Sequence, residues 1–182
     1  MEKMKAIAIV SGGLDSVAMS YVLVSEGYEL VLISFNYGQR HSKELDYAAL
    51  CAGHLKSEHH IVDVRALTNL MNTSSLTSNS IEVPDGHYAE ETMKQTVVPN
   101  RNAIMINIAT ALAVSKEVSV VATGVHGGDH FIYPDCRPKF IDSQLETLKI
   151  ANDGFIATDF QLLTPFIHKS KADIVSAGEL VG

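Results

Sequence analysis

The sequence lacks tryptophan and has only two cysteines, Cys51 and Cys136, among its 182 residues. Two cysteines cannot build a network of disulfides, and no Cys-x-x-Cys pair of the kind that binds zinc is present. Long apolar runs are also missing, because stretches such as Leu30–Phe35 fall far short of the roughly 18 apolar residues that a membrane helix requires. The short apolar run Ala6–Val10 near the N-terminus is too brief for a signal peptide. We therefore expect a cytoplasmic protein with no membrane partner.

The sequence also has few positively charged residues. The sequence has 14 Lys and Arg against 21 Asp and Glu, a formal net charge of −7. An acidic surface repels a phosphate backbone, so we expect no nucleic-acid partner. A small anionic ligand can still bind, because a local pocket of amides with one or two cations is enough. The length and the 46% of hydrophobic residues predict a single domain over residues 1–182.

Short apolar segments alternate with segments of helical periodicity. Strands are expected at Lys5–Val10, Leu30–Phe35, His60–Val64 and Val118–Val125, with a short edge at Gln161–Thr164. Helices are expected from Leu14 to a cap at Gly27, around Ala48–Leu55, and at Ala66–Met71, Arg101–Ser115, Phe140–Ala151 and Ser170–Leu180. The Arg101–Ser115 helix is apolar nearly all round, which is typical of a buried helix. This order predicts an α/β fold, a doubly wound, mainly parallel sheet with helices on both faces.

Periodicity is lost between Asn72 and Pro99, a stretch rich in Ser, Thr and Asn. A long irregular insertion in a compact domain is often a lid or a binding loop. We expect a mobile lid at about 72–98 that orders over the substrate.

The strongest motif is Ser-Gly-Gly-Leu-Asp-Ser, residues 11–16, placed where the first strand becomes the first helix. In a doubly wound sheet this turn lies at the carboxyl edge, where ligands bind. Two glycines let the backbone approach an anion, and the helix-start amides point towards it. Asp15 would repel a bare phosphate, so it indicates either a magnesium ion or a cap on the helix amides. The alternative is an ordinary strand–helix turn with a Ser or Asp cap.

This motif is neither a Walker A loop nor a Rossmann Gly-x-Gly-x-x-Gly. It resembles the pyrophosphate loop (PP-loop) of ATP-pyrophosphatases, which cleave ATP to AMP and pyrophosphate. Four later segments narrow the resemblance: 36–41 (NYGQRH), 99–102 (PNRN), 124–137 (GVHGGDHFIYPDCR), and 164–166 (TPF) followed by Lys171. Together they resemble the 7-cyano-7-deazaguanine synthase family of queuosine-type deazapurine biosynthesis, whose fold is of the adenine nucleotide alpha-hydrolase type.

The sequence departs from the family pattern at three places. Residues 126–129 read His-Gly-Gly-Asp where many members have Cys-Glu-Thr-Asp, and Asn100 replaces the usual glycine. The sequence given also stops at Gly182, whereas the family continues into a zinc segment of four cysteines. The resemblance thus implies Zn²⁺, but its cysteine ligands are missing here, so we expect a truncated chain or a lost zinc lobe. Without that lobe, four apolar side chains of the last helix are expected to face solvent or a second subunit in a homodimer: Ile174, Val175, Leu180 and Val181.

The resemblance implies an ATP-dependent ligase that converts 7-carboxy-7-deazaguanine and ammonia to the nitrile through adenylated intermediates. Its cofactors would be ATP and Mg²⁺, with Asp15 as the candidate magnesium ligand. ATP would be held by Val10, Ser11, Gly12, Gly13, Leu14, Asp15, Ser16 and Val17. Candidate catalytic residues are Asp15, Ser16, Arg101 and Lys171. Candidate substrate-binding residues are Tyr37, Gln39, Arg40, Asp135 and Arg137.

Each role has a structural alternative. Lys171 could be a solvated helix lysine, and Arg40 and Arg101 could form surface salt bridges. Asp135 and Arg137 could belong to a structural turn.

Other residues that could carry chemistry are given structural roles. His126, Asp129 and His130 could form a metal triad, but one short loop without a distant ligand favours hydrogen bonding. Cys51 is expected in the core, and nothing in the sequence makes Cys136 a nucleophile.

Two other functions remain open. Another PP-loop ligase, such as an NAD or GMP synthetase acting on a related carboxylate, would share the first motif but not Tyr-Pro-Asp-Cys-Arg. An ATP- or AMP-binding regulatory module would share the fold without ligating anything. Release of AMP and pyrophosphate that depends on the carboxylated deazaguanine separates the enzyme from such a module.

Overall fold

The computed structural model of the chain describes residues 4–37, 43–68 and 100–181. The expected lid at about 72–98 lies outside the described residues, as do Gln39 and Arg40. No helix among the described residues is long and apolar enough to cross a membrane.

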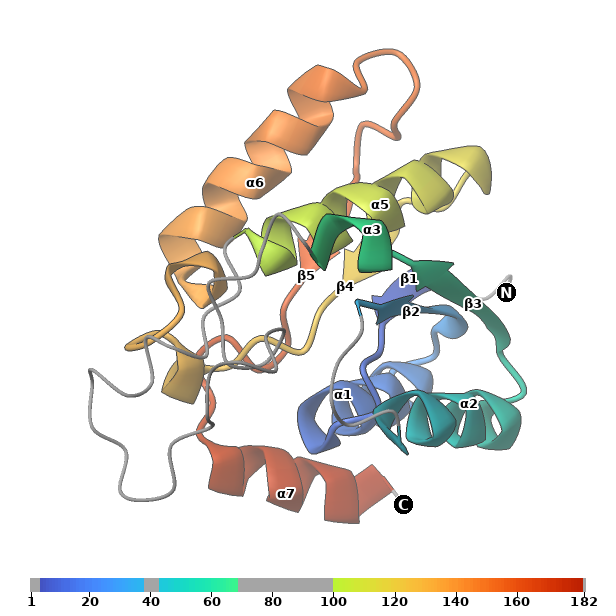
Figure 1. Ribbon diagram of the computed structural model, residues 1–182, viewed down its shortest axis with the longest axis vertical. Helices are drawn as coiled ribbons and strands as arrows, with labels where there is room; N and C mark the ends of the chain where they lie inside the picture. Colours follow the sequence, from blue (N-terminus) through green and yellow to red (C-terminus); the bar gives the residue numbers. More distant parts are fainter. Residues whose placement is uncertain (1–3, 38–42, 69–99, 182) are drawn as a thin grey trace.

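Within these ranges, a parallel sheet of five strands forms the centre of the fold (Figure 1). The strands are β1 (Lys5–Ile9), β2 (Glu29–Asn36), β3 (Glu58–Asp63), β4 (Val120–Ala122) and β5 (Gln161–Leu163), in the order β3-β2-β1-β4-β5. The register aligns Ile7 with Val31 of β2 and with Val121 of β4. All three side chains are buried, because a sheet covered on both faces needs apolar residues on both sides of each central strand.

Helices cover the two faces of the sheet (Figure 1). One face carries α1 (Leu14–Ser25), α2 (Lys43–Leu55) and α7 (Lys171–Val181), and the other carries α3 (Arg65–Thr68), α5 (Arg101–Ser115) and α6 (Pro138–Ala151). Two short 3₁₀ turns, η1 (Gly127–Asp129) and η2 (Pro134–Cys136), follow β4. The predicted doubly wound α/β fold is therefore confirmed, and Gly27 follows α1 with φ +96° as a helix-ending glycine does.

Two sequence-based expectations were wrong in detail. The fourth strand is shorter than Val118–Val125, since hydrogen bonding to the sheet gives way to the loop that carries η1. The α5 helix is not buried all round: Asn107, Ala111 and Ser115 form an exposed stripe, four residues apart. A small alanine between two polar residues can face water without penalty, so the apolar composition exaggerated how much of the helix is buried.

The last helix also differs from expectation. Ile174 is fully buried, whereas Val175 and Leu180 are 41% and 86% exposed. The buried face of α7 packs on α1, and a Cβ atom at Gly178 would stand 3.6 Å from the Cβ of Ala18. Ile174 therefore belongs to the core and is unavailable to a second subunit.

Candidate active site

The candidate site lies where the winding of the sheet reverses. The chain leaves β1 towards β2 on one side, and β4 pairs with β1 on the other. At such a switch point the loops at the carboxyl ends of the two strands diverge and leave a crevice between them. Residues 11–16 follow β1, and His126 and Asp129 follow β4, so side chains from distant parts of the sequence meet at this edge.

The loop after β1 is held in one shape by its glycines and serines. Gly12 has φ +88°, and a Cβ atom there would stand 1.9 Å from the backbone oxygen of Glu44. The Ser16 hydroxyl donates to the carbonyl of Gly13 at 3.0 Å, and the Ser11 and Ser16 hydroxyls lie 3.2 Å apart. No side chain among the described residues caps the start of α1 at Gly13. The first amides of the helix are therefore available to an anion, as a pyrophosphate loop requires.

The apolar members of the predicted ATP-binding set contribute differently. Val10 is fully buried beneath the loop, Val17 is half-buried, and the Leu14 side chain is 48% exposed. None of these side chains can bond a phosphate, so any contact with ATP would come from their backbone atoms.

Asp15 is joined to Lys171 across 156 residues of sequence. The Lys171 Nζ atom lies 2.6 Å from Asp15 Oδ2. Lys171 is thus ion-paired to Asp15 although its side chain is 56% exposed, and Asp15 does not cap its own helix. The second oxygen, Asp15 Oδ1, is buried and has no hydrogen-bond partner in the part of the chain that the structure describes. A buried carboxylate oxygen without a donor is a natural ligand for a cation.

A second carboxylate, Asp129, lies beside this pair. His126 Nε2 is 3.4 Å from Asp129 Oδ2 and 3.7 Å from Asp15 Oδ2. Burial raises the pKa of Asp129, nearby His126 opposes that rise, the negative charge of Asp15 adds to it, and Lys171 and Arg101 lower it. Two carboxylates and two permanent cations therefore share one partly buried site.

Gly124 brings the two loops together. A Cβ atom at this position would stand 3.2 Å from backbone atoms of Asp15 and Ser16. Only glycine lets the chain after β4 pass this close to the start of α1. Sequence reasoning did not assign Asp129 to the site, although its place after the strand that pairs with β1 was the available signal.

Arg101, the first residue of α5, is held by two tyrosines. Its guanidinium hydrogen-bonds the Tyr37 side chain and lies 6.0 Å from the centre of the Tyr133 ring. Burial raises the pKa of Tyr37, and the charge and hydrogen bond of Arg101 oppose the rise. Arg101 thus lies at the carboxyl edge, and no salt bridge to it occurs among the described residues. Tyr133 was missed by the sequence prediction, although it begins the Tyr-Pro-Asp-Cys-Arg segment.

Asp135 and Arg137 are engaged within the fold. Asp135 Oδ2 accepts the backbone N–H of Asn102 at 3.0 Å, at the start of α5. Arg137 Nε donates to the carbonyl of His130 at 2.7 Å. Asp135 and Arg137 therefore both make hydrogen bonds that stabilise the fold, as the alternative of a structural turn predicts, and each side chain keeps further polar atoms. Asn102, which sequence reasoning also missed, additionally donates to Cys136 Sγ at 3.1 Å.

The cysteines are not placed for reaction or for zinc. Burial raises the pKa of Cys136 to about 12, so its thiol stays protonated. Cys51 is buried in α2, on the opposite face of the sheet, as expected of a core residue. Among the described residues, no group of three or more His, Cys, Asp and Glu could hold a metal ion. A four-thiolate zinc site does not fit these residues. Magnesium fits better, because it is usually bound by one or two carboxylates together with phosphate oxygens.

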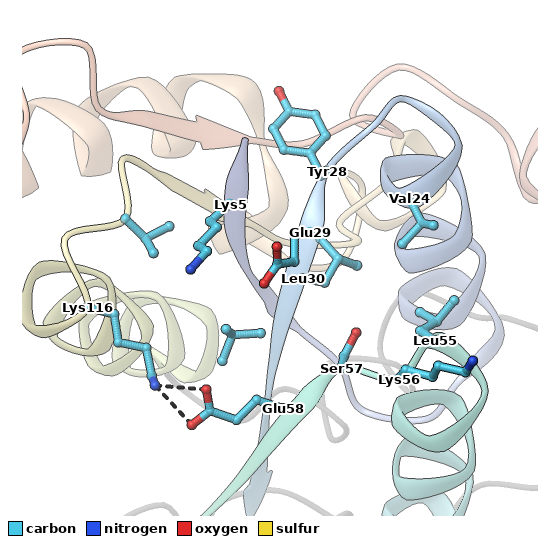
Figure 2. A pocket seen from close by; sticks show the side chains of 12 residues that line it. Lys5, Val24, Tyr28, Glu29, Leu30, Leu55, Lys56, Ser57, Glu58 and Lys116 are labelled. Atoms are coloured by element: carbon cyan, nitrogen blue, oxygen red, sulfur yellow. Dashed lines mark hydrogen bonds and ion pairs between the residues drawn. The ribbon is translucent and has the colours of Figure 1, made fainter. Parts of the chain in front are cut away.

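The opposite edge of the sheet holds a cavity of about 350 Å³ (Figure 2). It lies at the strand starts, beside Lys5, Glu29 and Glu58, and Glu58 is ion-paired to Lys116 at 2.9 Å. None of the predicted site residues that the structure describes lines it. The cavity is therefore separate from the candidate active site.

Comparison with known proteins identifies close relatives of the chain. The chain is 54% identical over 176 residues to a 7-cyano-7-deazaguanine synthase of Rhizobium etli (strain CIAT 652), which covers 97% of this chain and 73% of that protein. It is 54% identical over 175 residues to the 7-cyano-7-deazaguanine synthase of Paracoccus denitrificans (strain Pd 1222), with 96% and 74% covered. The chain thus spans about three quarters of the length of these relatives.

Solved structures share the fold at low sequence identity. An NH₃-dependent NAD synthetase from Campylobacter jejuni has a TM-score of 0.55 and 11% identity, covering all of this chain and 65% of that one. A predicted subunit of tRNA methyltransferase from Methanocaldococcus jannaschii has a TM-score of 0.54 and 18% identity, covering 97% and 74%.

The sequence profile of the family described as "Queuosine biosynthesis protein QueC" matches residues 5–182, which is nearly the whole chain. With relatives at 54% identity and a PP-loop fold whose motif residues meet at one edge of the sheet, the chain belongs to the QueC family of 7-cyano-7-deazaguanine synthases.

Proposed function

We propose that this chain is an ATP-dependent ligase that converts 7-carboxy-7-deazaguanine and ammonia to 7-cyano-7-deazaguanine, with AMP and pyrophosphate as the other products. The observation that carries the proposal is the contact of Lys171 with Asp15 at an uncapped, glycine-dependent helix start. A cation, a carboxylate with one unpartnered oxygen and free amides are the groups that a nucleotide's phosphates and their metal ion require.

The chemistry explains why ATP is needed. A carboxylate is a poor acyl donor, because ammonia would have to expel oxide. Transfer of AMP from ATP to the carboxylate releases pyrophosphate and makes AMP the leaving group, so ammonia can form the amide. A second transfer of AMP to the amide oxygen releases another pyrophosphate, and loss of AMP and protons then leaves the nitrile. Neither adenylation needs a protein nucleophile, which agrees with the protonated state of Cys136.

The protein's contribution would be positioning and charge stabilisation. The loop amides and the Ser11 and Ser16 hydroxyls would hold the pyrophosphate portion of ATP, and Lys171 would offset the charge that develops as it leaves. Asp15 Oδ1 would bind a magnesium ion together with phosphate oxygens. Bound magnesium would neutralise charge on the departing pyrophosphate.

The deazaguanine acid would bind next to Arg101. The guanidinium is held against Tyr37 and Tyr133, so it can meet a carboxylate without losing side-chain freedom on binding. Asp135 has one carboxylate oxygen beyond its bond to Asn102, and Arg137 has donors beyond its bond to His130. These atoms could recognise the guanine-like edge and the acid of the substrate, in keeping with the resemblance-based roles.

The test is product formation by the purified chain with ATP, Mg²⁺, ammonium and 7-carboxy-7-deazaguanine, followed by mass spectrometry. We expect the nitrile to accumulate with AMP and pyrophosphate, and Lys171→Met to abolish it while leaving the thermal unfolding midpoint nearly unchanged. ATP binding without AMP release would instead identify a regulatory module. Turnover with a different carboxylate only would identify another PP-loop ligase.

A further inference from the structure

The loop after β4 contains a buried histidine at a position where the family resemblance led us to expect cysteine. The His126 side chain is only 8% exposed. Its Nε2 atom faces one oxygen of each site carboxylate, at 3.4 Å from Asp129 and 3.7 Å from Asp15. A buried imidazole aimed at two carboxylates is an arrangement that core packing alone does not require.

The proton position of the His126 ring is set by its neighbour. The backbone N–H of Gly128 donates to His126 Nδ1 at 3.0 Å, so Nδ1 acts as an acceptor. In a neutral imidazole the hydrogen must then be on Nε2, which is the atom that faces the carboxylates. A Cβ atom at Gly128 would stand 2.9 Å from His126 Cε1, so a side chain there would push the ring out of place.

The same loop is tied to the segment that carries Lys171. The backbone N–H of Gly127 donates to the carbonyl of Lys169 at 3.0 Å, and a Cβ atom at Gly127 would stand 3.0 Å from that oxygen. Lys171 in turn binds Asp15 Oδ2, the oxygen that His126 also faces. Both glycines of the loop thus serve one arrangement, in which a lysine and an imidazole N–H approach the same carboxylate oxygen.

We propose that His126 is a positioning residue: its Nε2 side, 3.4 Å from Asp129 Oδ2 and 3.7 Å from Asp15 Oδ2, attracts both oxygens and orients the two carboxylates, which leaves Asp15 Oδ1 to the magnesium ion of the nucleotide. The magnesium role in this inference rests on the proposed function, whereas the arrangement of His126 and the two carboxylates does not. A thiol, the residue seen in many members of the resembled family, is a much weaker hydrogen-bond donor than an imidazole N–H.

Two substitutions distinguish the role of Nδ1 from the role of Nε2. An asparagine amide can reach the position of Nδ1 and accept the Gly128 N–H, but it falls short of the carboxylates. A glutamine amide can reach the position of Nε2 and donate to them. We therefore expect His126→Asn to weaken binding of Mg²⁺ with a non-hydrolysable ATP analogue by about tenfold, because polar contacts of 3.4 and 3.7 Å are weaker than a full hydrogen bond to a charged group. We expect His126→Gln to stay within about threefold of the parent protein.

The tautomer is measured independently by ¹⁵N–¹H correlation of the histidine side chains in the ligand-free protein. We expect a hydrogen on Nε2 of His126 and none on Nδ1. A hydrogen on Nδ1 would overturn the proposal, as would equal losses of analogue affinity in the Asn and Gln variants. Neither measurement uses the deazaguanine, so a chain that makes no nitrile could still confirm or refute the role of His126. If the parent protein fails to form the nitrile, that result contradicts the proposed function and leaves the role of His126 to the two measurements above.

Discussion

Asp15→Asn separates the folding role of this residue from its role in catalysis. The substitution keeps the shape of the side chain and removes its charge. Lys171, its partner at 2.6 Å, is 56% exposed, and an ion pair with such an exposed member contributes between about 0 and 1 kcal/mol. Loss of repulsion towards Asp129 offsets part of this. The free energy of unfolding should thus change by less than about 1 kcal/mol, so the melting temperature should shift by no more than roughly 2–4 °C for a chain of this size.

Catalysis should respond far more strongly. Removing one group that stabilises charge in the transition state typically lowers kcat by about 10²–10³-fold. The assay is pyrophosphate release at saturating ATP and Mg²⁺, with thermal unfolding measured on the same samples. A matched control is Glu58→Gln, which breaks the exposed ion pair to Lys116 at the opposite edge of the sheet. It should lower stability by a similar small amount and leave kcat unchanged. Equal pyrophosphate release by Asp15→Asn and the parent protein would refute the metal and phosphate role of Asp15.

Three further predictions concern the fold around the site. Gly12→Ala should lower the free energy of unfolding by about 2–4 kcal/mol, measured by denaturant titration, because of its φ of +88° and the contact with Glu44; an unchanged midpoint would contradict this. Ile174→Ala should lower the free energy of unfolding by about 2–4 kcal/mol because Ile174 is fully buried, whereas Leu180→Ala should lower it by less than about 0.5 kcal/mol because Leu180 is exposed. The reverse ranking would mean that α7 packs by its other face. Cys136 should resist alkylation at pH 8 until the protein unfolds. Because the folded state keeps a thiol proton that the unfolded chain loses above pH 9.0, stability relative to Cys136→Ser should fall as pH rises from 9.0 towards 12; a pH-independent difference would contradict the raised pKa.

Much of the fold could be predicted because its signals are local. The apolar run at Lys5–Ile9, the glycines at positions 12 and 13 and the helical stripe that follows fix a strand–loop–helix unit. Repetition of such units implies a parallel sheet. The extent of burial could not be predicted as well. The exposed stripe on α5 and the buried Ile174 depend on which neighbour covers each helix, and composition does not contain that information.

The residues of the candidate site could be predicted where they belong to a local sequence motif. They could not be predicted where only tertiary contacts bring them together. The Ser11–Ser16 loop was found from its sequence alone, and Lys171 from the resemblance. His126 and Asp129 join them only because β4 pairs with β1 and Gly124 permits a close approach, which no local pattern reveals. Asp135 shows the converse, since a side chain predicted to bind the substrate also supports the start of α5, which the motif does not reveal.

The central claim is that this chain activates a carboxylate by transferring AMP to its oxygens. Isotope transfer tests it most directly: 7-carboxy-7-deazaguanine labelled with ¹⁸O at both carboxylate oxygens is incubated with the chain, unlabelled ATP, Mg²⁺ and ammonium, and the AMP is analysed by mass spectrometry. The mechanism predicts a nitrile free of oxygen label, two AMP molecules for each nitrile, and one ¹⁸O atom in each AMP. Unlabelled AMP, with the label found in phosphate or pyrophosphate or retained in the deazaguanine, would contradict the adenylation mechanism.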